Sequence, residues 1–178
     1  FRRVLFRSEL FSIQLQNRQQ QGRDGVWLDL PTTTEQVQAA LQQIGISSDN
    51  PQGLFISGYF AEEEKRFATP YNMVLASNVD ELNFLASRLE TLSTGERAEL
   101  NAALQAPQSE LFSIGRITDF PENVDYYVHL PDVHGPAQLG DYYLNRSGMV
   151  DMPEEWKGGI DTAQFGRYVA QQEQGVFT

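Results

Sequence analysis

The sequence predicts an α+β fold composed of three small α/β modules. Stretches with apolar residues at alternate positions indicate strands, and stretches with apolar residues three and four positions apart indicate helices. Helix caps and turn residues separate these stretches at short intervals, so every element is expected to be short. The expected modules are residues 9–60, 61–106 and 107–178. Residues 1–8 (FRRVLFRS) have no cap and only a short apolar core, and we interpret them as a non-native leader.

A β-hairpin is expected at the start of the first module. Leu10–Leu15 and Val26–Leu30 both have apolar residues at alternate positions, and the polar stretch Asn17–Gly25 between them contains glycine. This pattern predicts two strands joined by a loop. Trp27 lies within the alternation of the second strand, so we expect it to belong to the core.

A helix and a third strand complete the first module. Thr32 and Glu35 have the spacing of a capping box, and Gly45 is placed to end the helix. Leu54–Phe60 has the composition of a strand, with Gly58 as the expected position of a bulge or a close backbone contact. The apolar face of the helix consists of Val37, Ala40, Leu41 and Ile44.

Two consecutive helices form the expected core of the second module. Asn78 with Glu81 and Ser93 with Glu96 both match the capping pattern, and Pro107 ends the second helix. The short connection between them predicts an αα-hairpin. The apolar stripes are Leu82, Leu85, Ala86, Leu89 and Leu92 on the first helix, and Leu100, Ala103 and Leu104 on the second.

The third module is rich in turns. Leu111–Ile117 fits a helix or a strand equally well, whereas Asp125–Leu130 has the β-branched and aromatic content of a strand. Frequent Gly and Pro residues follow, so we expect a helix only after Asp161, which pairs with Gln164 as a cap. Trp156 is expected to anchor a loop.

Acidic residues greatly outnumber basic ones. The chain has 24 Asp and Glu against 13 Lys and Arg, a formal charge of −11, which becomes −14 without the three arginines of the leader. After residue 105 there are eleven acidic and four basic residues. Such a charge repels nucleic acid, so we expect no direct binding to nucleic acid. It attracts basic surfaces of other proteins, although it also has the simpler interpretation of keeping a protein soluble.

The composition also bears on location. No stretch approaches the roughly 20 apolar residues that a membrane span requires. The chain has no cysteine, which fits a reducing compartment. We therefore expect a cytoplasmic protein without membrane contact.

Catalytic and metal-binding motifs are missing from the sequence. It contains no phosphate-binding loop, dinucleotide fingerprint, zinc-protease helix, nucleophile elbow or calcium loop, and His129 and His134 lack the spacing of a metal pair on a helix. Paired carboxylates roughly 5–10 Å apart would suit a hydrolase, but with so many acids some pair meets that condition in any fold. We therefore expect no cofactor and no metal.

Four segments, in this order, have a more specific pattern. Their residues include a W-L-D-L-P strand end, an N-x-L-A-x-x-L helix, an L-G-x-Y step, and I-D-x-x-x-x-G followed by G-x-F-T. Together they resemble the ArdA-type antirestriction proteins of plasmids, conjugative transposons and phages. The segments are Gly25–Pro31, Asn78–Leu92, His129–Leu144 and Met152–Thr178.

The resemblance implies an elongated chain of three modules with an acidic surface whose carboxylates imitate the phosphates of B-form DNA. It implies a homodimer that occupies the DNA-binding cleft of type I restriction-modification enzymes and catalyses nothing. The carboxylates implied to contact the partner are Asp80, Glu81, Glu90, Glu96, Glu99, Asp119, Glu122, Asp125, Asp132, Asp141, Asp151, Glu154, Glu155 and Asp161.

Two alternatives stay open from the sequence. An anti-CRISPR protein, or another acidic decoy of a nucleic-acid-binding enzyme, would use the same surface against a different target. A small acid/base hydrolase would instead concentrate its function in two carboxylates with shifted pKa values, in a pocket lined by aromatic side chains. Candidates for such a lining are Trp27, Tyr126, Tyr127 and Trp156.

Overall fold

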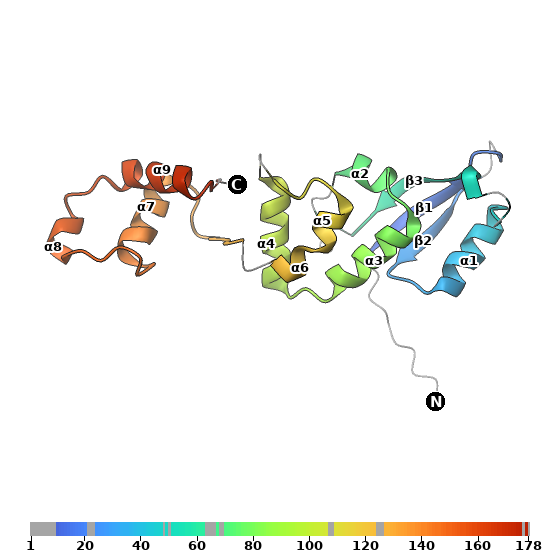
Figure 1. Ribbon diagram of the computed structural model, residues 1–178, viewed down its shortest axis with the longest axis horizontal. Coiled ribbons are helices and arrows are strands. Elements are labelled where there is room, and N and C mark those ends of the chain that lie inside the picture. Colours follow the sequence, from blue (N-terminus) through green and yellow to red (C-terminus); the bar gives the residue numbers. More distant parts are fainter. Residues whose placement is uncertain are drawn as a thin grey trace, which may run out of the picture. The chain divides into compact units, whose positions relative to one another are not determined.

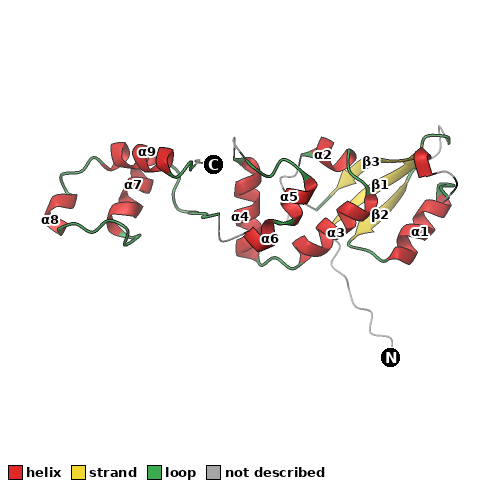
Figure 2. Ribbon diagram, in the orientation of Figure 1, coloured by secondary structure: helices red, strands yellow, loops and turns green. Residues whose placement is uncertain are grey.

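The computed structural model describes residues 10–20, 24–47, 49, 51–62, 67, 70–106, 109–123, 127–175 and 177. Over these residues the chain combines one small antiparallel sheet with short helices, which confirms the α+β class (Figures 1 and 2). It divides into two compact units. The N-terminal unit comprises residues 1–104 and 110–127, and the C-terminal unit comprises residues 105–109 and 128–178. The division into three modules is not confirmed and stays a prediction.

The sheet has the strand order β2-β1-β3, and β1 pairs antiparallel with both neighbours. Its strands are β1 (Phe11–Asn17), β2 (Val26–Leu30) and β3 (Leu54–Phe60), which confirms the predicted hairpin and the third strand. Side chains of β1 alternate between buried and half-buried, because successive residues of a strand point to opposite faces. One face of the sheet therefore contributes to the core.

The expected irregularity in β3 is present. Gln14 pairs with Gly58 but the next residue, Leu15, pairs with Ile56, so Ser57 is an extra residue that forms a bulge. The Ser57 hydroxyl donates to the Gln14 side-chain oxygen at 3.0 Å. A Cβ at position 58 would come within 3.2 Å of Gln14 Cβ, which explains why the strand has glycine there.

Helix α1 (Thr34–Gln43) confirms the predicted helix. The predicted capping residues of this helix are wrong. The capping box is formed by Thr33 and Gln36, one residue later than the predicted pair Thr32 and Glu35. Three consecutive threonines each have a hydroxyl that can cap the helix. The sequence pattern alone therefore does not select which threonine is the cap.

A contact with α3 explains this shift. The backbone N–H of Thr32 donates to Asn83 Oδ1 at 2.7 Å, and Asn83 Nδ2 donates to the carbonyl oxygen of Thr32 at 3.1 Å. This pair of bonds holds Thr32 in the loop that precedes α1, so the helix starts after the next threonine. The same bonds link the first predicted module to the second.

The described part of the N-terminal unit has five further α-helices, and α3 and α4 confirm the two predicted helices with their caps. The predicted αα-hairpin is wrong, because α3 packs mainly against α5 and the sheet rather than along α4. The ambiguous stretch around residue 114 is helical. The helices are α2 (Tyr71–Leu75), α3 (Val79–Glu90), α4 (Thr94–Gln105), α5 (Ile114–Thr118) and α6 (Phe120–Asn123).

One hydrophobic core runs through the whole N-terminal unit. It includes Ile13 and Leu30 from the sheet, Leu82 and Leu89 from α3, and Phe120 from α6, each at most 1% exposed. Residues of all three predicted modules therefore share one core. This sharing is why the sheet and the helices up to α6 form a single unit.

In the C-terminal unit the described residues form three helices: α7 (Pro136–Asn145), α8 (Glu154–Lys157) and α9 (Thr162–Gln172). The expectation that only the segment after Asp161 is helical is wrong, because α7 begins at Pro136, where the missing N–H costs nothing. The predicted strand is also wrong over its described part, since residues 127–130 form no strand. Its first residues, the leader and Pro107 lie outside the described residues.

Close backbone contact joins α7 to α9. A Cβ on Gly140 would lie 1.9 Å from the Thr162 carbonyl oxygen, and one on Gly166 would lie 1.8 Å from the Pro136 carbonyl oxygen. The two glycines thus let the helices approach more closely than any other residue would permit. Among the described residues, no helix is both long and apolar enough to cross a membrane.

Candidate partner-binding surface

The predicted carboxylates lie on both units, and Asp125 lies outside the described residues. In the N-terminal unit they are Asp80, Glu81 and Glu90 on α3, Glu96 and Glu99 on α4, Asp119 at the end of α5, and Glu122 on α6. In the C-terminal unit they are Asp132 before α7, Asp141 on α7, Asp151 before α8, Glu154 and Glu155 on α8, and Asp161 before α9.

None of the described candidates is buried. Four are half-buried, and the other nine are exposed. Water therefore reaches every one of these carboxylates, so a partner can reach them as well. The half-buried residues are Glu90, Glu96, Glu99 and Asp141.

Several candidates also stabilise helix starts. Glu96 Oε2 accepts from the backbone N–H of Ser93 at 2.7 Å, and Asp161 Oδ1 accepts from the backbone N–H groups of Ala163 and Gln164 at 2.9 and 3.0 Å. Negative charge at a helix N-terminus is favourable because the exposed N–H groups are positive. The other candidates in first helical turns are Asp80, Glu81, Glu122, Glu154 and Glu155.

Among the described residues, ion pairs give three of the candidates a counter-ion from their own unit, which partly cancels the field that they present to a partner. The ion pairs are Arg88 with Glu122 at 2.6 Å, Arg146 with Asp141 at 3.4 Å, and Lys157 with Glu154 at 2.9 Å.

Apart from Glu90, which has a further interaction, four candidates belong to neither group. Within the described part of the chain, Glu99, Asp119, Asp132 and Asp151 have no ion pair, and their carboxylates neither cap a helix start nor occupy a first helical turn. Two of them lie in each unit. Their charge is uncompensated and has no role in holding the fold, so they are the best-placed candidates for contact with a basic partner.

The shifted carboxyl groups do not have the character of a general acid. Hydrogen bonds with the side chain and then the backbone of Ser93 lower the pKa of Glu96. Its own backbone N–H and then the Thr33 hydroxyl lower the pKa of Glu35. A general acid needs a raised pKa to hold its proton near neutral pH. Both carboxylates instead accept hydrogen bonds in the first turn of a helix.

The two tryptophans do not line a common site. Trp27 is 49% exposed on the open face of the sheet, so its prediction as a core residue is wrong. The alternation places Leu28 and Leu30 on the buried face and Trp27 on the other. Trp156 is 65% exposed on α8, so it does not anchor a loop. Among the described residues, no group of three or more His, Cys, Asp or Glu could hold a metal ion.

Sequence reasoning missed one carboxylate near the predicted set. Glu110 is exposed and lines a cavity together with Asp119, Phe120 and Tyr127. Its position three residues before Ser113, which caps α5, places it in the loop that leads into that helix. The capping serine was the signal that could have identified this exposed loop.

Comparison with known protein families gives one match. A family model described as antirestriction protein (ArdA) matches residues 21–178 of this chain. The match includes all fourteen predicted carboxylates, the whole C-terminal unit, and the N-terminal unit except residues 1–20. No curated protein sequence matches the chain. Because the family model covers well over half of the sequence, the chain belongs to the ArdA family of antirestriction proteins.

Proposed function

We propose that this protein blocks type I restriction-modification enzymes by occupying their DNA-binding cleft in place of DNA. The observation that carries the proposal is the family match over residues 21–178. The exposed carboxylates support the proposal. A decoy for DNA needs negative charges that lie on the surface and are not all neutralised by counter-ions of the same chain. The protein acts in the cytoplasm as a homodimer and catalyses no reaction.

The mechanism is competition for a basic groove. A DNA-binding cleft carries Lys and Arg side chains that displace counter-ions from phosphates. Exposed carboxylates on both units meet the same side chains and exclude the substrate. Each contact is weak on its own, since exposed charge pairs contribute about 0.2–1 kcal/mol. The affinity therefore comes from many carboxylates acting together, and no single one is essential to the field.

Cleavage of an unmodified plasmid by a purified type I restriction enzyme, with ATP present, tests the proposal. Titration with the protein should inhibit cleavage near stoichiometric amounts, and excess unmodified DNA should relieve the inhibition because both compete for one cleft. Inhibition that excess DNA does not relieve would contradict the competitive mechanism. Full cleavage at a large excess of the protein would rule out this enzyme class as the target.

A further inference from the structure

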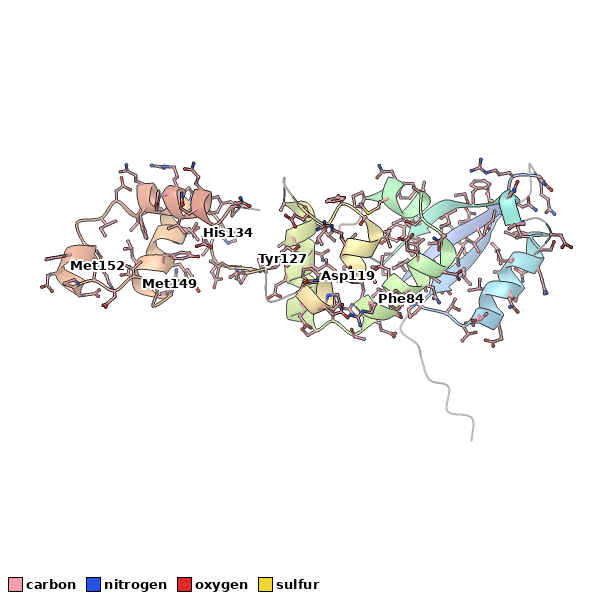
Figure 3. All side chains as sticks on the ribbon, viewed as in Figure 1. Phe84, Asp119, Tyr127, His134, Met149 and Met152 are labelled. Atoms are coloured by element: carbon pink, nitrogen blue, oxygen red, sulfur yellow. The ribbon has the colours of Figure 1, made fainter. Side chains whose placement is uncertain are left out.

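A cavity of about 350 Å³ lies in the N-terminal unit beside α5 and α6. Two carboxylates contribute to its lining, and Figure 3 labels Asp119 and Tyr127 on the ribbon. Its volume is within the range of small-ligand pockets, and it is open to solvent on one side. The lining residues are Glu110, Leu111, Arg116, Asp119, Phe120, Asn123 and Tyr127.

The lining combines an apolar part with hydrogen-bond acceptors. Leu111 is 5% exposed and Phe120 is 1% exposed, and the ring of Tyr127 lies 5.1 Å from the ring of Phe120 between centroids. Asn123 Nδ2 donates to the Asp119 carbonyl oxygen at 2.9 Å, which leaves the Asn123 side-chain oxygen as an acceptor. The Asp119 carboxylate is exposed and makes no ion pair with the described residues.

The contacts of Arg116 show that groups at this cavity can hold a guanidinium. Its Nη1 lies 3.5 Å from Glu110 Oε2, and its Cζ lies 4.9 Å from the centroid of the Phe112 ring. A guanidinium is thus placed between a carboxylate and an aromatic face. This pair is exposed and long, so it is weak and exchangeable. The second carboxylate, Asp119, makes no ion pair with the described residues, so it can accept another cation.

We propose that this cavity binds the guanidinium group of an arginine side chain that a partner presents. Asp119 and the Asn123 side-chain oxygen accept its N–H groups, and the half-exposed ring of Tyr127 packs against its planar face. In the setting of the proposed function, the arginine belongs to the basic cleft of the restriction enzyme. The cavity then acts as one anchoring point within a surface whose other carboxylates contribute weakly and additively.

Binding of a small probe tests the cavity independently of any enzyme. N-acetylarginine amide should shift NMR signals of the cavity residues saturably, with a Kd on the order of millimolar for so small a ligand. The citrulline analogue has the same shape without the charge and should shift them at least about tenfold less at equal concentration. Equal binding of the two probes, or shifts spread evenly over the surface, would overturn the proposal.

Two substitutions should change probe affinity in opposite directions. Asp119→Asn removes the accepting charge and should weaken binding about tenfold, whereas Arg116→Gln removes a competing cation and should strengthen it severalfold. Damage to the fold would weaken binding in both variants, so the opposite signs separate recognition from instability. Unchanged affinity in both variants would contradict the assignment of the cavity.

Inhibition of cleavage distinguishes failure of the cavity from failure of the proposed function. If the cavity is an anchor, Asp119→Asn should raise the protein concentration needed for inhibition at least about fivefold more than the control Asp151→Asn. Equal effects of the two substitutions would overturn the anchoring role while inhibition by the unchanged protein stands. Probe binding without any inhibition would leave the cavity assignment supported and remove the proposed target.

Discussion

Individual carboxylates of this chain have two separable physical roles. All of them add negative charge, but Glu96 and Asp161 also accept backbone N–H groups at the start of a helix. Asp119 and Asp151 have no such bond among the described contacts. Substitution of a capping carboxylate therefore changes stability and charge together, whereas substitution at Asp119 or Asp151 changes mainly charge.

Asp161 allows the two roles to be separated at one position. Asp161→Ala removes the cap of α9 and should lower the free energy of unfolding by about 1 kcal/mol. Asp161→Asn keeps a good capping side chain, so its unfolding free energy should stay within a few tenths of a kcal/mol of the original. Urea denaturation followed by circular dichroism measures both variants. Equal destabilisation by Ala and Asn would show that charge, not capping, stabilises α9.

Glu96 should make stability depend on pH. Its folded-state pKa is lowered below 4.5 by hydrogen bonds with Ser93, so the ionised form stabilises the folded state. That contribution is fully present above the unfolded-state pKa and is lost as the pH falls through the folded-state pKa. The stability difference between the unchanged protein and Glu96→Gln, measured by urea denaturation, should therefore disappear in acid. In a Ser93→Ala background the difference should be smaller near neutral pH, because the Ser93 hydroxyl no longer lowers the pKa of Glu96.

The contact between α7 and α9 leaves no room for a side chain at Gly140 or Gly166. Gly140→Ala would place a methyl group 1.9 Å from the Thr162 carbonyl oxygen, so the helices would have to separate. We expect a loss of about 3 kcal/mol in the stability of the C-terminal unit. Hydrogen exchange of the amides in α9 measures this loss directly.

Gly158→Ala is the matched control in the same unit. No atom lies within 4 Å of the added methyl group, and the backbone φ of −62° suits any residue. The free energy of opening that hydrogen exchange reports for the amides of α9 should change by no more than about 0.5 kcal/mol. Similar exchange rates in the Gly140 and Gly158 variants would contradict the close approach of the two helices.

Local patterns in the sequence were sufficient for most elements of the N-terminal unit. Alternation identified the strands, and the caps Asn78 and Ser93 placed α3 and α4, because these signals act over only a few residues. The cap of α1 was misplaced because Asn83, far away in sequence, binds Thr32. Helix α7 was missed because Gly140 reads as a turn residue until its contact with α9 is known.

The candidate site was harder to predict than the fold. The acidic composition and the family resemblance identified the candidate carboxylates. The amino-acid sequence does not reveal which of these carboxylates have counter-ions. Arg88 and Glu122 are 34 residues apart in the chain, and only the packing of the N-terminal unit brings them within 2.6 Å. Glu110 was missed for the same reason, since its neighbours in the cavity come from the folded arrangement of α5 and α6.

At the level of the whole chain, both units carry excess negative charge. Residues of the C-terminal unit include seven Asp or Glu and three Lys or Arg, and those of the N-terminal unit include seventeen and ten. The net charges are therefore −4 and −7, which together give the −11 of the chain. A partner with one continuous basic groove would interact favourably with both units.

The complex with a restriction enzyme should weaken as salt concentration rises. Contacts between many exposed carboxylates and a basic cleft are screened over about 10 Å at 0.1 M salt. We expect the Kd, measured by fluorescence anisotropy, to rise at least about tenfold between 50 and 200 mM NaCl, as charge-dominated complexes do. A Kd that does not change over this range would indicate that apolar contacts dominate.

In the proposed function, uncompensated carboxylates on both units compete with DNA. The decisive comparison is inhibition of plasmid cleavage by a variant with four substitutions and a variant with six. One replaces the carboxylates without a counter-ion or a capping role: Glu99→Gln, Asp119→Asn, Asp132→Asn and Asp151→Asn. The other replaces both members of each ion pair and leaves the net charge unchanged: Arg88 with Glu122, Arg146 with Asp141, and Lys157 with Glu154.

The first variant should need a concentration at least about tenfold higher than the original protein for half-maximal inhibition. The concentration needed of the second variant should stay within about twofold of the original. Circular dichroism should confirm that both variants are folded. Equal inhibition by the two variants and the original protein would contradict the claim that these carboxylates take the place of DNA phosphates.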